Sequence, residues 1–345
     1  MSTKQSTREE LEKRLEALVA DKKLSAERGS SDDLVPKFQP WDIPQLDEIT
    51  GGIPLEKFTL LYGESSHGKT LLTMFAAKSF QQANKLVALV DAEQSFDPRW
   101  WQTIGVDTNL MSVHQPAYGE EAVMEVERLI GKVDLLILDS LAALIPLREQ
   151  EVDLTKKGTM GLQAQLITDL YKKSLSKAKK SGTALMFINQ VRDNFDNPYV
   201  VQLPGGRAQR FYSHMMIEVA RHEWMKDGAG NKTGFNMRIR LEKNKLGLAY
   251  QTIFLPFSFE GVFDFLTLLV GDAIDRGVIQ NAGAYYRFPA DIPFDPETTN
   301  LPNVNRFKVN DDGTQQVMGR DSVHALLEAN PQAAKLIELQ VYDKE

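Results

Sequence analysis

Residues 63–70 carry the side chains that a phosphate-binding loop requires. Their sequence fits the spacing G-x-x-x-x-G-K-[ST] and reads Gly63-Glu64-Ser65-Ser66-His67-Gly68-Lys69-Thr70. The glycines let backbone N–H groups turn towards phosphate oxygens, and the helix expected next adds its positive end. Lys69 is expected to contact the β- and γ-phosphates, and the Thr70 hydroxyl to ligate Mg²⁺. The segment therefore predicts a site for ATP and Mg²⁺.

Two predicted strands end in acidic residues that could serve the same site. The apolar run 135–138 leads into Asp139, and an acid at this place holds Mg²⁺ in phosphate-loop enzymes. The apolar run 86–90 leads into Asp91 and Glu93. Glu93 could polarise an attacking water, but either acid could instead cap the following turn, and the pattern does not choose between them.

An amide pair, Asn189 and Gln190, follows the apolar run 184–188 in the same way. The carboxyl ends of parallel strands line the crevice where ligands bind in open α/β sheets. An amide there could touch both the γ-phosphate and a loop beyond it. A structural amide fits the spacing equally well.

The composition is that of a folded protein and excludes several kinds of site. The 345 residues are 42% hydrophobic and 25% charged and include no cysteine, which excludes disulfides and thiolate metal sites. No apolar run is long enough to cross a bilayer, and the amino terminus lacks the apolar stretch of a signal peptide. We therefore expect a cytoplasmic protein with no membrane partner.

One segment is strongly basic although the net charge is −7. Residues 154–182 contain seven lysines and one acid, Asp169, which gives 7 − 1 = +6. The lysines are Lys156, Lys157, Lys172, Lys173, Lys177, Lys179 and Lys180. Such a cluster fits either a solvated helix face or a surface for nucleic-acid phosphates.

Short apolar runs and helical patterns alternate along the middle of the chain. The runs are bounded by polar or glycine residues, as buried parallel strands are. In chain order, the runs and the helical patterns between them are 58–62, 69–83, 86–90, 120–131, 135–138, 161–180 and 184–188. This alternation predicts an α/β fold with a mostly parallel, twisted sheet flanked by helices.

Three parts are expected along the chain. Residues 1–35 have the pattern of a helix and a polar linker, which either frays or contacts a neighbouring subunit. Residues 36–262 form the nucleotide-binding core, with later strands at 236–242 and 250–255. Residues 263–345 form a small α+β carboxy-terminal domain.

The ordered motifs resemble those of the RecA recombinase family, which has bacterial and phage-encoded members. The resemblance covers about residues 40–288. Besides the phosphate loop, it rests on Gly51-Gly52-Ile53-Pro54, Asp91-Ala92-Glu93, residues 138–144, residues 187–192 and Lys243-Asn244-Lys245. It implies a RecA-type ATPase core.

The resemblance implies roles for individual residues. The catalytic set consists of Lys69, the glutamate Glu93 and the γ-phosphate sensor Gln190. Asp97 and Trp100 fall where the adenine is hydrogen-bonded and stacked. Lys243 and Lys245 match a pair that reaches the ATP of the neighbouring subunit, so the site is complete only in a filament.

Two DNA-contacting loops are also implied, at about residues 152–161 and 192–207. The residues expected to contact DNA are Met160, Gly161, Gln165, Lys172, Arg192, Phe195, Gly205, Gly206 and Arg207. The sequence departs from the family at Gln165, where an arginine is common, and at Glu64 and His67 in the phosphate loop.

The sequence therefore predicts a DNA recombinase that depends on ATP and Mg²⁺. Its partners are single-stranded and double-stranded DNA, further copies of itself in a helical filament, and single-strand-binding or mediator proteins. Its function is homologous pairing and strand exchange in DNA recombination and repair. Two alternatives stay open: a ring-forming helicase or motor on the same core, and an ATP-switched assembly module that does not engage DNA.

Overall fold

The computed structural model describes residues 2–24, 26–148, 161–191 and 203–342. The chain divides into two units, Met1–Phe38 and Gln39–Glu345. Among the described residues, no helix is long and apolar enough to cross a membrane. Each unit is built differently, the first around one helix and the second around a large sheet.

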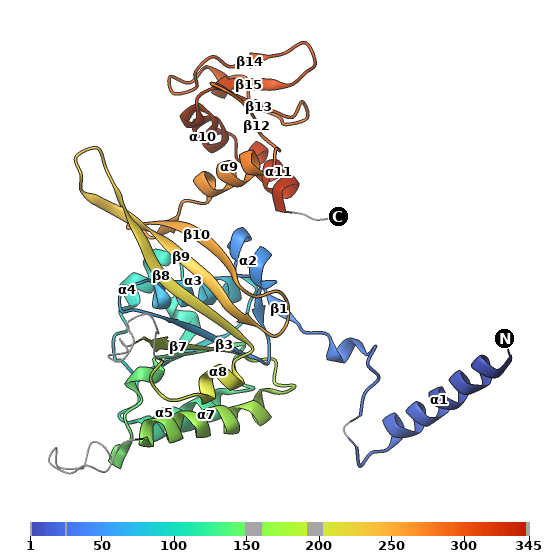
Figure 1. Ribbon diagram of the computed structural model, residues 1–345. Helices are drawn as coiled ribbons and strands as arrows, with labels where there is room; N and C mark the ends of the chain where they lie inside the picture. The colour runs from blue at the N-terminus through green and yellow to red at the C-terminus, as the bar shows by residue number, and fades with distance from the viewer. Residues whose placement is uncertain (1, 25, 149–160, 192–202, 343–345) are drawn as a thin grey trace, which may run out of the picture. The chain divides into compact units, whose positions relative to one another are not determined.

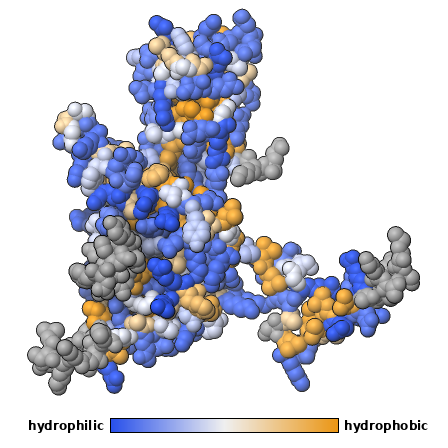
Figure 2. Space-filling view, viewed as in Figure 1, coloured by the Kyte–Doolittle hydropathy of each residue, from blue (hydrophilic) through white to orange (hydrophobic). Residues whose placement is uncertain are grey.

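The first unit contains helix α1 (Ser2–Ala20). Leu11, Leu15 and Leu18 recur at helical spacing and are 57%, 39% and 53% exposed. Figure 2 shows orange, hydrophobic atoms on the surface of the segment that contains α1. Within its own unit, α1 therefore presents an apolar stripe to solvent.

A nine-stranded sheet forms the centre of the second unit (Figure 1). Its strands lie in the order β11 (Val262–Phe263), β10 (Gln251–Ser258), β9 (Lys232–Asn244), β8 (Met215–Lys226), β3 (Phe58–Gly63), β7 (Ala184–Gln190), β6 (Leu135–Asp139), β4 (Val87–Asp91) and β5 (Met111–His114). From β8 to β5 all neighbours pair in parallel, whereas β9, β10 and β11 are antiparallel additions. The predicted α/β fold with a mostly parallel sheet is confirmed.

Helices cover both faces of this sheet. One face packs against α2 (Pro44–Thr50), α3 (Lys69–Gln82) and α4 (Pro98–Ile104). The other face packs against α5 (Gly119–Leu129), α7 (Leu162–Ala178) and Tyr212 of α8 (Ala208–Tyr212). Figure 1 shows α5 and α7 side by side on that face. Two short strands, β1 (Phe38–Gln39) and β2 (Ile53–Pro54), precede β3.

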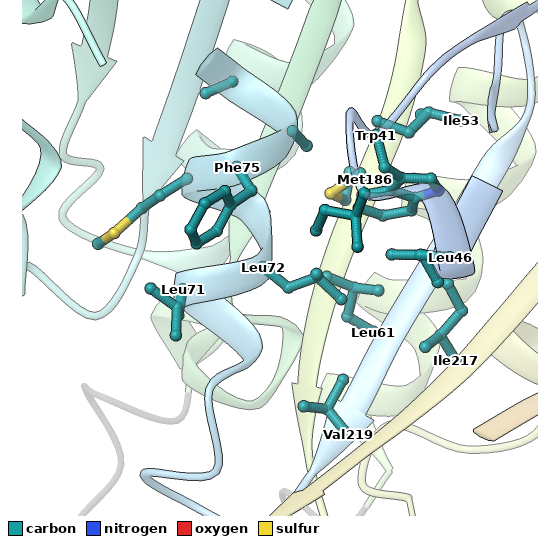
Figure 3. Packing of buried hydrophobic residues seen from close by; sticks show 14 of the residues in the cluster. Trp41, Leu46, Ile53, Leu61, Leu71, Leu72, Phe75, Met186, Ile217 and Val219 are labelled. Atoms are coloured by element: carbon teal, nitrogen blue, oxygen red, sulfur yellow. The ribbon is translucent and has the colours of Figure 1, made fainter. Parts of the chain in front are cut away.

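The strand β3 is buried on both faces, as its largely apolar sequence predicts. Phe58, Leu60 and Tyr62 point into the core shared with α5 and α7, and Leu61 points into the core beneath α3. Figure 3 shows Leu61 beside Leu72 of α3. The strand that leads into the phosphate loop is thus held rigidly from both sides.

The carboxy-terminal part has its own hydrophobic core of 15 buried residues. It contains α9 (Phe265–Asp275), β12 (Gln280–Ala282), β13 (Tyr285–Phe288), β14 (Lys308–Val309), β15 (Gln315–Met318), α10 (Arg320–Ala329) and α11 (Pro331–Tyr342). The four strands form an antiparallel sheet in the order β12-β13-β15-β14. An α+β arrangement follows from these elements.

A polar network joins this part to the core. The Tyr342 hydroxyl donates to Asp272 Oδ2 at 2.5 Å, and Gln45 Nε2 of α2 donates to both groups at 2.7 and 3.1 Å. Arg276 of α9 pairs with Glu48 of α2. Because partly buried polar groups without partners cost stability, each member of the network supports the others.

We expect Tyr342→Phe to lower the free energy of unfolding by about 1–2 kcal/mol, because Asp272 and Gln45 each lose a hydrogen bond. Calorimetry should detect a fall in Tm of about 2–5 °C. The matched control is Tyr285→Phe, whose hydroxyl contacts Arg306 at an exposed position. An equal Tm for both variants would show that the network contributes nothing.

Candidate functional site

Four neighbouring strand ends form the candidate site. The strands β3, β7, β6 and β4 are consecutive in the sheet, and their parallel pairing brings their carboxyl ends to one edge. Gly63 of β3 lies opposite Gln190 of β7, and Asp139 of β6 lies opposite Asp91 of β4. The candidate phosphate, metal and catalytic groups therefore meet although they are far apart in sequence.

The first and last glycines of residues 63–68 are required by close packing. A Cβ on Gly63 would lie 2.0 Å from the Val219 carbonyl oxygen of β8. A Cβ on Gly68 would lie 2.4 Å from Met237 Cε, and Gly68 has a φ of 94°, which favours glycine. Gly68 also forms the N-cap of α3, so the helix begins where a phosphate would lie.

Lys69 lies under the phosphate loop and is 6% exposed. Its ammonium donates to the carbonyl oxygens of Gly63 and Glu64 at 3.0 and 2.6 Å, and burial lowers its pKa. The next residue, Thr70, donates its hydroxyl to Asp139 Oδ2 at 2.7 Å. Thr70 and Asp139 thus place a hydroxyl and a carboxylate together, which are the hard oxygen donors that Mg²⁺ prefers.

Asp139 is almost completely buried, with 5% exposure. Burial raises the pKa of Asp139 to about 6, and Glu93 and Asp91 act in the same direction. The Thr70 hydroxyl and the Lys69 ammonium oppose the shift. A divalent cation would favour the ionised form for the same electrostatic reason.

Asp91 and Glu93, which the sequence pattern left unassigned, have different hydrogen-bond partners in the structure. Asp91 is 1% exposed, and its carboxylate accepts the backbone N–H groups of Ser95 and Phe96 at 3.2 and 3.0 Å. It therefore caps the following turn, with a third hydrogen bond from Gln115 at 3.0 Å. Glu93 is exposed at the strand ends, where it is accessible to a ligand.

Glu93 receives two hydrogen bonds on the same oxygen. The Ser140 hydroxyl donates to Glu93 Oε1 at 2.5 Å, and Gln190 Nε2 donates to it at 2.8 Å. A cavity of about 410 Å³ adjoins this contact and is lined by Glu93, Gln190, Val191, Ala92, Ala142, Ala143 and Ile145. The sequence reasoning missed Ser140; its place directly after an acid-ended strand is the signal that could have found it.

The two neighbouring amides have different partners. Asn189 is fully buried and donates to the Pro204 carbonyl at 3.0 Å and to Gln209 Oε1 at 2.7 Å. Gln209 in turn donates to the Pro204 and Gly206 carbonyls. Asn189 is thus a structural amide for the end of the second expected DNA loop, while Gln190 contacts Glu93.

Two glycines of the second expected DNA loop pack against α7. A Cβ on Gly205 would lie 2.2 Å from Ile167 Cδ1, and one on Gly206 would lie 3.2 Å from Ala164 Cβ. Both glycines have φ near 80°, at 87° and 77°. Arg207 is exposed beside them. The predicted residues Met160, Arg192 and Phe195 lie outside the described residues.

The basic segment contributes to one face of α7. Gln165 and Lys172 are both exposed and are seven residues apart, so they lie on the same side of the helix, with Gly161 at its N-cap. Lys173 and Lys177 instead pair with Glu127 of α5 at 3.2 and 3.0 Å. Part of the counted charge is therefore balanced within the fold.

Asp97 and Trp100 lie at the start of α4, near Thr70 and Asp139. Both Asp97 oxygens contact Arg99, one of them also capping the helix through the Arg99 N–H, and this holds the pKa of Asp97 below its ordinary value. Trp100 is 37% exposed and meets Phe257 edge-on. A cavity of about 210 Å³ connects Asp97 and Trp100 with Thr70 and Asp139.

Lys243 and Lys245 contact the last turn of α8. Lys243 donates to the Arg210 and Phe211 carbonyls, and Lys245 donates to the Phe211 carbonyl at 3.1 Å. Burial is the main cause that lowers the pKa of His214 to about 4, and the charges of both lysines act in the same direction. They therefore form a positive group beside a neutral histidine.

These lysines lie near the amino ends of β8 and β3, whereas the phosphate loop follows the carboxyl end of β3. Asn244, between them, pairs with Met215, which pairs with Thr59 near the amino end of β3. The phosphate loop begins at Gly63, four residues further along β3, or about 13 Å at ~3.3 Å per residue. Their predicted contact with ATP therefore needs another subunit.

His67 is largely enclosed, with its side chain 12% exposed. Its Nε2 is 3.5 Å from Glu64 Oε2, and burial lowers the pKa of His67. Arg221 of β8 also contributes to this lowering. Both effects favour the neutral imidazole, whereas the charge of Glu64 acts in the opposite direction.

Comparison with known proteins identifies relatives for most of the chain. The RecA N-terminal domain family matches residues 45–262. RecA of Aquifex aeolicus is 36% identical over 267 residues, which cover 74% of this chain and 76% of that protein. RecA of Chlorobaculum tepidum is 32% identical over 301 residues, covering 85% and 79%. RecA of Cytophaga hutchinsonii is 29% identical over 300 residues, covering 85% and 77%.

We expect Asp139→Asn to stabilise the protein in the absence of nucleotide and Mg²⁺. Because the folded pKa of about 6 lies above the ordinary value of 3.8, ionisation of Asp139 costs stability as the pH rises through this interval. The variant should therefore gain about 2–6 °C in Tm at about pH 8 and lose this gain near pH 4.

Differential scanning calorimetry at both pH values measures this effect. The matched control is Asp107→Asn, an exposed N-cap where asparagine caps equally well. A gain for Asp139→Asn that is the same at both pH values would contradict the assignment of the effect to the buried charge.

Proposed function

The chain belongs to the RecA family, and from this membership we propose that it is an ATP-dependent DNA recombinase. It assembles as a helical filament on single-stranded DNA, pairs that strand with homologous duplex and exchanges strands in DNA recombination and repair. ATP favours the state that holds DNA, and hydrolysis favours release. Such a switch works only through a different affinity of ATP for the two states.

One observation carries this proposal, the adjacency of two amides on β7. Gln190 contacts Glu93 at the hydrolysis site, and Asn189 holds Pro204 at the end of the DNA loop. In the proposed switch, Gln190 responds to the γ-phosphate and shifts the strand end that it shares with Asn189. Gly205 and Gly206 transmit this movement to α7 because they pack directly on Ala164 and Ile167.

The chemistry assigned to the site is in-line attack of water on the γ-phosphate. Glu93 takes a proton from the water, Lys69 balances the charge on the β- and γ-phosphates, and ADP leaves. Thr70 and Asp139 would hold Mg²⁺, which would supply positive charge to stabilise the phosphate oxygens. Asp97 and Trp100, which line the same cavity as Thr70 and Asp139, would hold the adenine.

A neighbouring subunit completes the site. Lys243 and Lys245 lie across the sheet from their own phosphate loop, so they serve the ATP of the next subunit. The exposed leucine stripe of α1 is a second contact between subunits. Head-to-tail contacts of this kind generate an open filament when the rotation does not close.

The decisive experiment combines electron microscopy with DNA affinity at one fixed salt concentration. A slowly hydrolysed ATP analogue should produce helical filaments on single-stranded DNA and raise the DNA affinity at least about tenfold over ADP. Closed rings that unwind duplex would favour the motor. Equal DNA affinity with the analogue, with ADP and without nucleotide, together with hydrolysis that ignores DNA, would favour the assembly module.

We also expect two inactive variants to restore each other. Lys69→Ala loses nucleotide binding, and the double variant Lys243→Ala/Lys245→Ala loses the contribution to its neighbour. In an equal mixture, about a quarter of the sites combine an intact Lys69 with intact neighbouring lysines, so about a quarter of the parent DNA-dependent hydrolysis should return.

The matched control replaces the double variant with a triple variant that also carries Lys69→Ala. No subunit then holds an intact phosphate loop, and mixing should restore nothing. If the first mixture hydrolyses ATP no faster than its two components measured separately, the site is not shared between subunits.

A further inference from the structure

Ser140 makes an unusual choice of hydrogen-bond partner. It is fully buried and occupies the N-cap of the short turn Leu141–Ala143, where a serine normally accepts a backbone N–H of that turn. The Ser140 side chain makes no capping hydrogen bond in this described segment. Its hydroxyl instead donates to Glu93 Oε1 at 2.5 Å. A purely structural serine at this place would be expected to cap the turn.

We propose that Ser140 is a positioning residue for the water-activating carboxylate of Glu93. The proposal rests on the catalytic role of Glu93 in the proposed function. The backbone of this residue is held by the same strand end, because the N–H groups of Ala92 and Glu93 donate to the Asp139 carbonyl. The end of β6 thus fixes the main chain of Glu93 through Asp139, and the next residue, Ser140, fixes its side chain.

The geometry divides the two carboxylate oxygens of Glu93 between two tasks. Both described donors, the Ser140 hydroxyl and the Gln190 amide, reach Oε1. This leaves Oε2 to accept a proton from water. A carboxylate that could rotate freely would present either oxygen in many directions, and a catalytic base needs reach and direction before it needs basicity.

The two donors differ in how firmly they are placed. Ser140 is 0% exposed and has a short side chain that follows a buried strand. Gln190 has a longer side chain, is only partly buried and stands beside the DNA-loop anchor Asn189. When Gln190 turns to the γ-phosphate in the proposed switch, Ser140 remains on Glu93 and keeps the base aimed.

The test is steady-state ATP hydrolysis of the full chain with saturating single-stranded DNA. Ser140→Ala should lower kcat about 10- to 50-fold, a part of the roughly 10²- to 10⁴-fold that a general base contributes. KM for ATP and the DNA affinity with a slowly hydrolysed analogue should stay within about twofold, since the fully buried Ser140 side chain is not accessible to either ligand. The matched control is Ser174→Ala, another fully buried serine, whose hydroxyl has no partner in the described structure; its kcat should equal the parent's.

A double-mutant cycle separates positioning from a general structural effect. If Ser140 acts through Glu93, Ser140→Ala should cost less than about twofold in a Glu93→Gln background. The same fold-loss in both backgrounds would overturn the proposal, as would an unchanged kcat or a rise in KM that accounts for the loss. If Glu93→Gln alone matches the parent, the base assignment itself fails, and the positioning role fails with it.

If Ser140→Ala does not fold, Ser140→Cys takes its place in the double-mutant cycle with Glu93→Gln. The thiol is close in size but is a weaker donor, so kcat should fall about 3- to 10-fold in the parent background and stay unchanged with Glu93→Gln. A cysteine variant with the parent's kcat, or with an equal loss in both backgrounds, overturns the proposal. The chain contains no other cysteine, so the thiol content of each preparation reports the substitution directly.

Discussion

The parallel pairing of β3, β7, β6 and β4 is the constraint from which the rest of the site follows. It sets Gly63 beside Gln190 and Asp139 beside Asp91, so loops that leave four separate strands share one small volume. Both faces of the sheet are buried, which keeps these ends in register. The close contact of Gly63 with the Val219 carbonyl then fixes how near the phosphate loop approaches β8.

Local sequence patterns were sufficient to predict the strands that end in the site. Each is a short apolar run, because a strand buried on both faces has no polar alternation to obscure it. The periodicity did not reveal β8, which begins buried at Met215 and becomes exposed beyond Arg221, with register shifts that interrupt its alternation. The edge strand β5 was missed for a related reason, since all four of its residues are only partly buried.

The hydrogen-bond partners of the polar residues could be identified only from the three-dimensional fold. Asp91 and Glu93 are two residues apart and equally acidic, and only the loop geometry turns one into a cap and leaves the other at the strand ends. The same holds for Asn189 and Gln190. Resemblance suggested that Gly205 and Gly206 approach DNA, and the structure adds a steric demand from α7 that operates whether or not DNA is bound.

The position of Lys243 and Lys245 gives the proposed polymer two unequal ends. In the proposed filament, each subunit would offer its lysines in one direction and its phosphate loop in the other, so the last subunit at one end would hold ATP that no neighbour helps to hydrolyse. That end would keep its triphosphate longest and dissociate slowest. Directional growth and loss of subunits would then follow from the antiparallel direction of a single strand, β9, which places its last residues away from the phosphate loop.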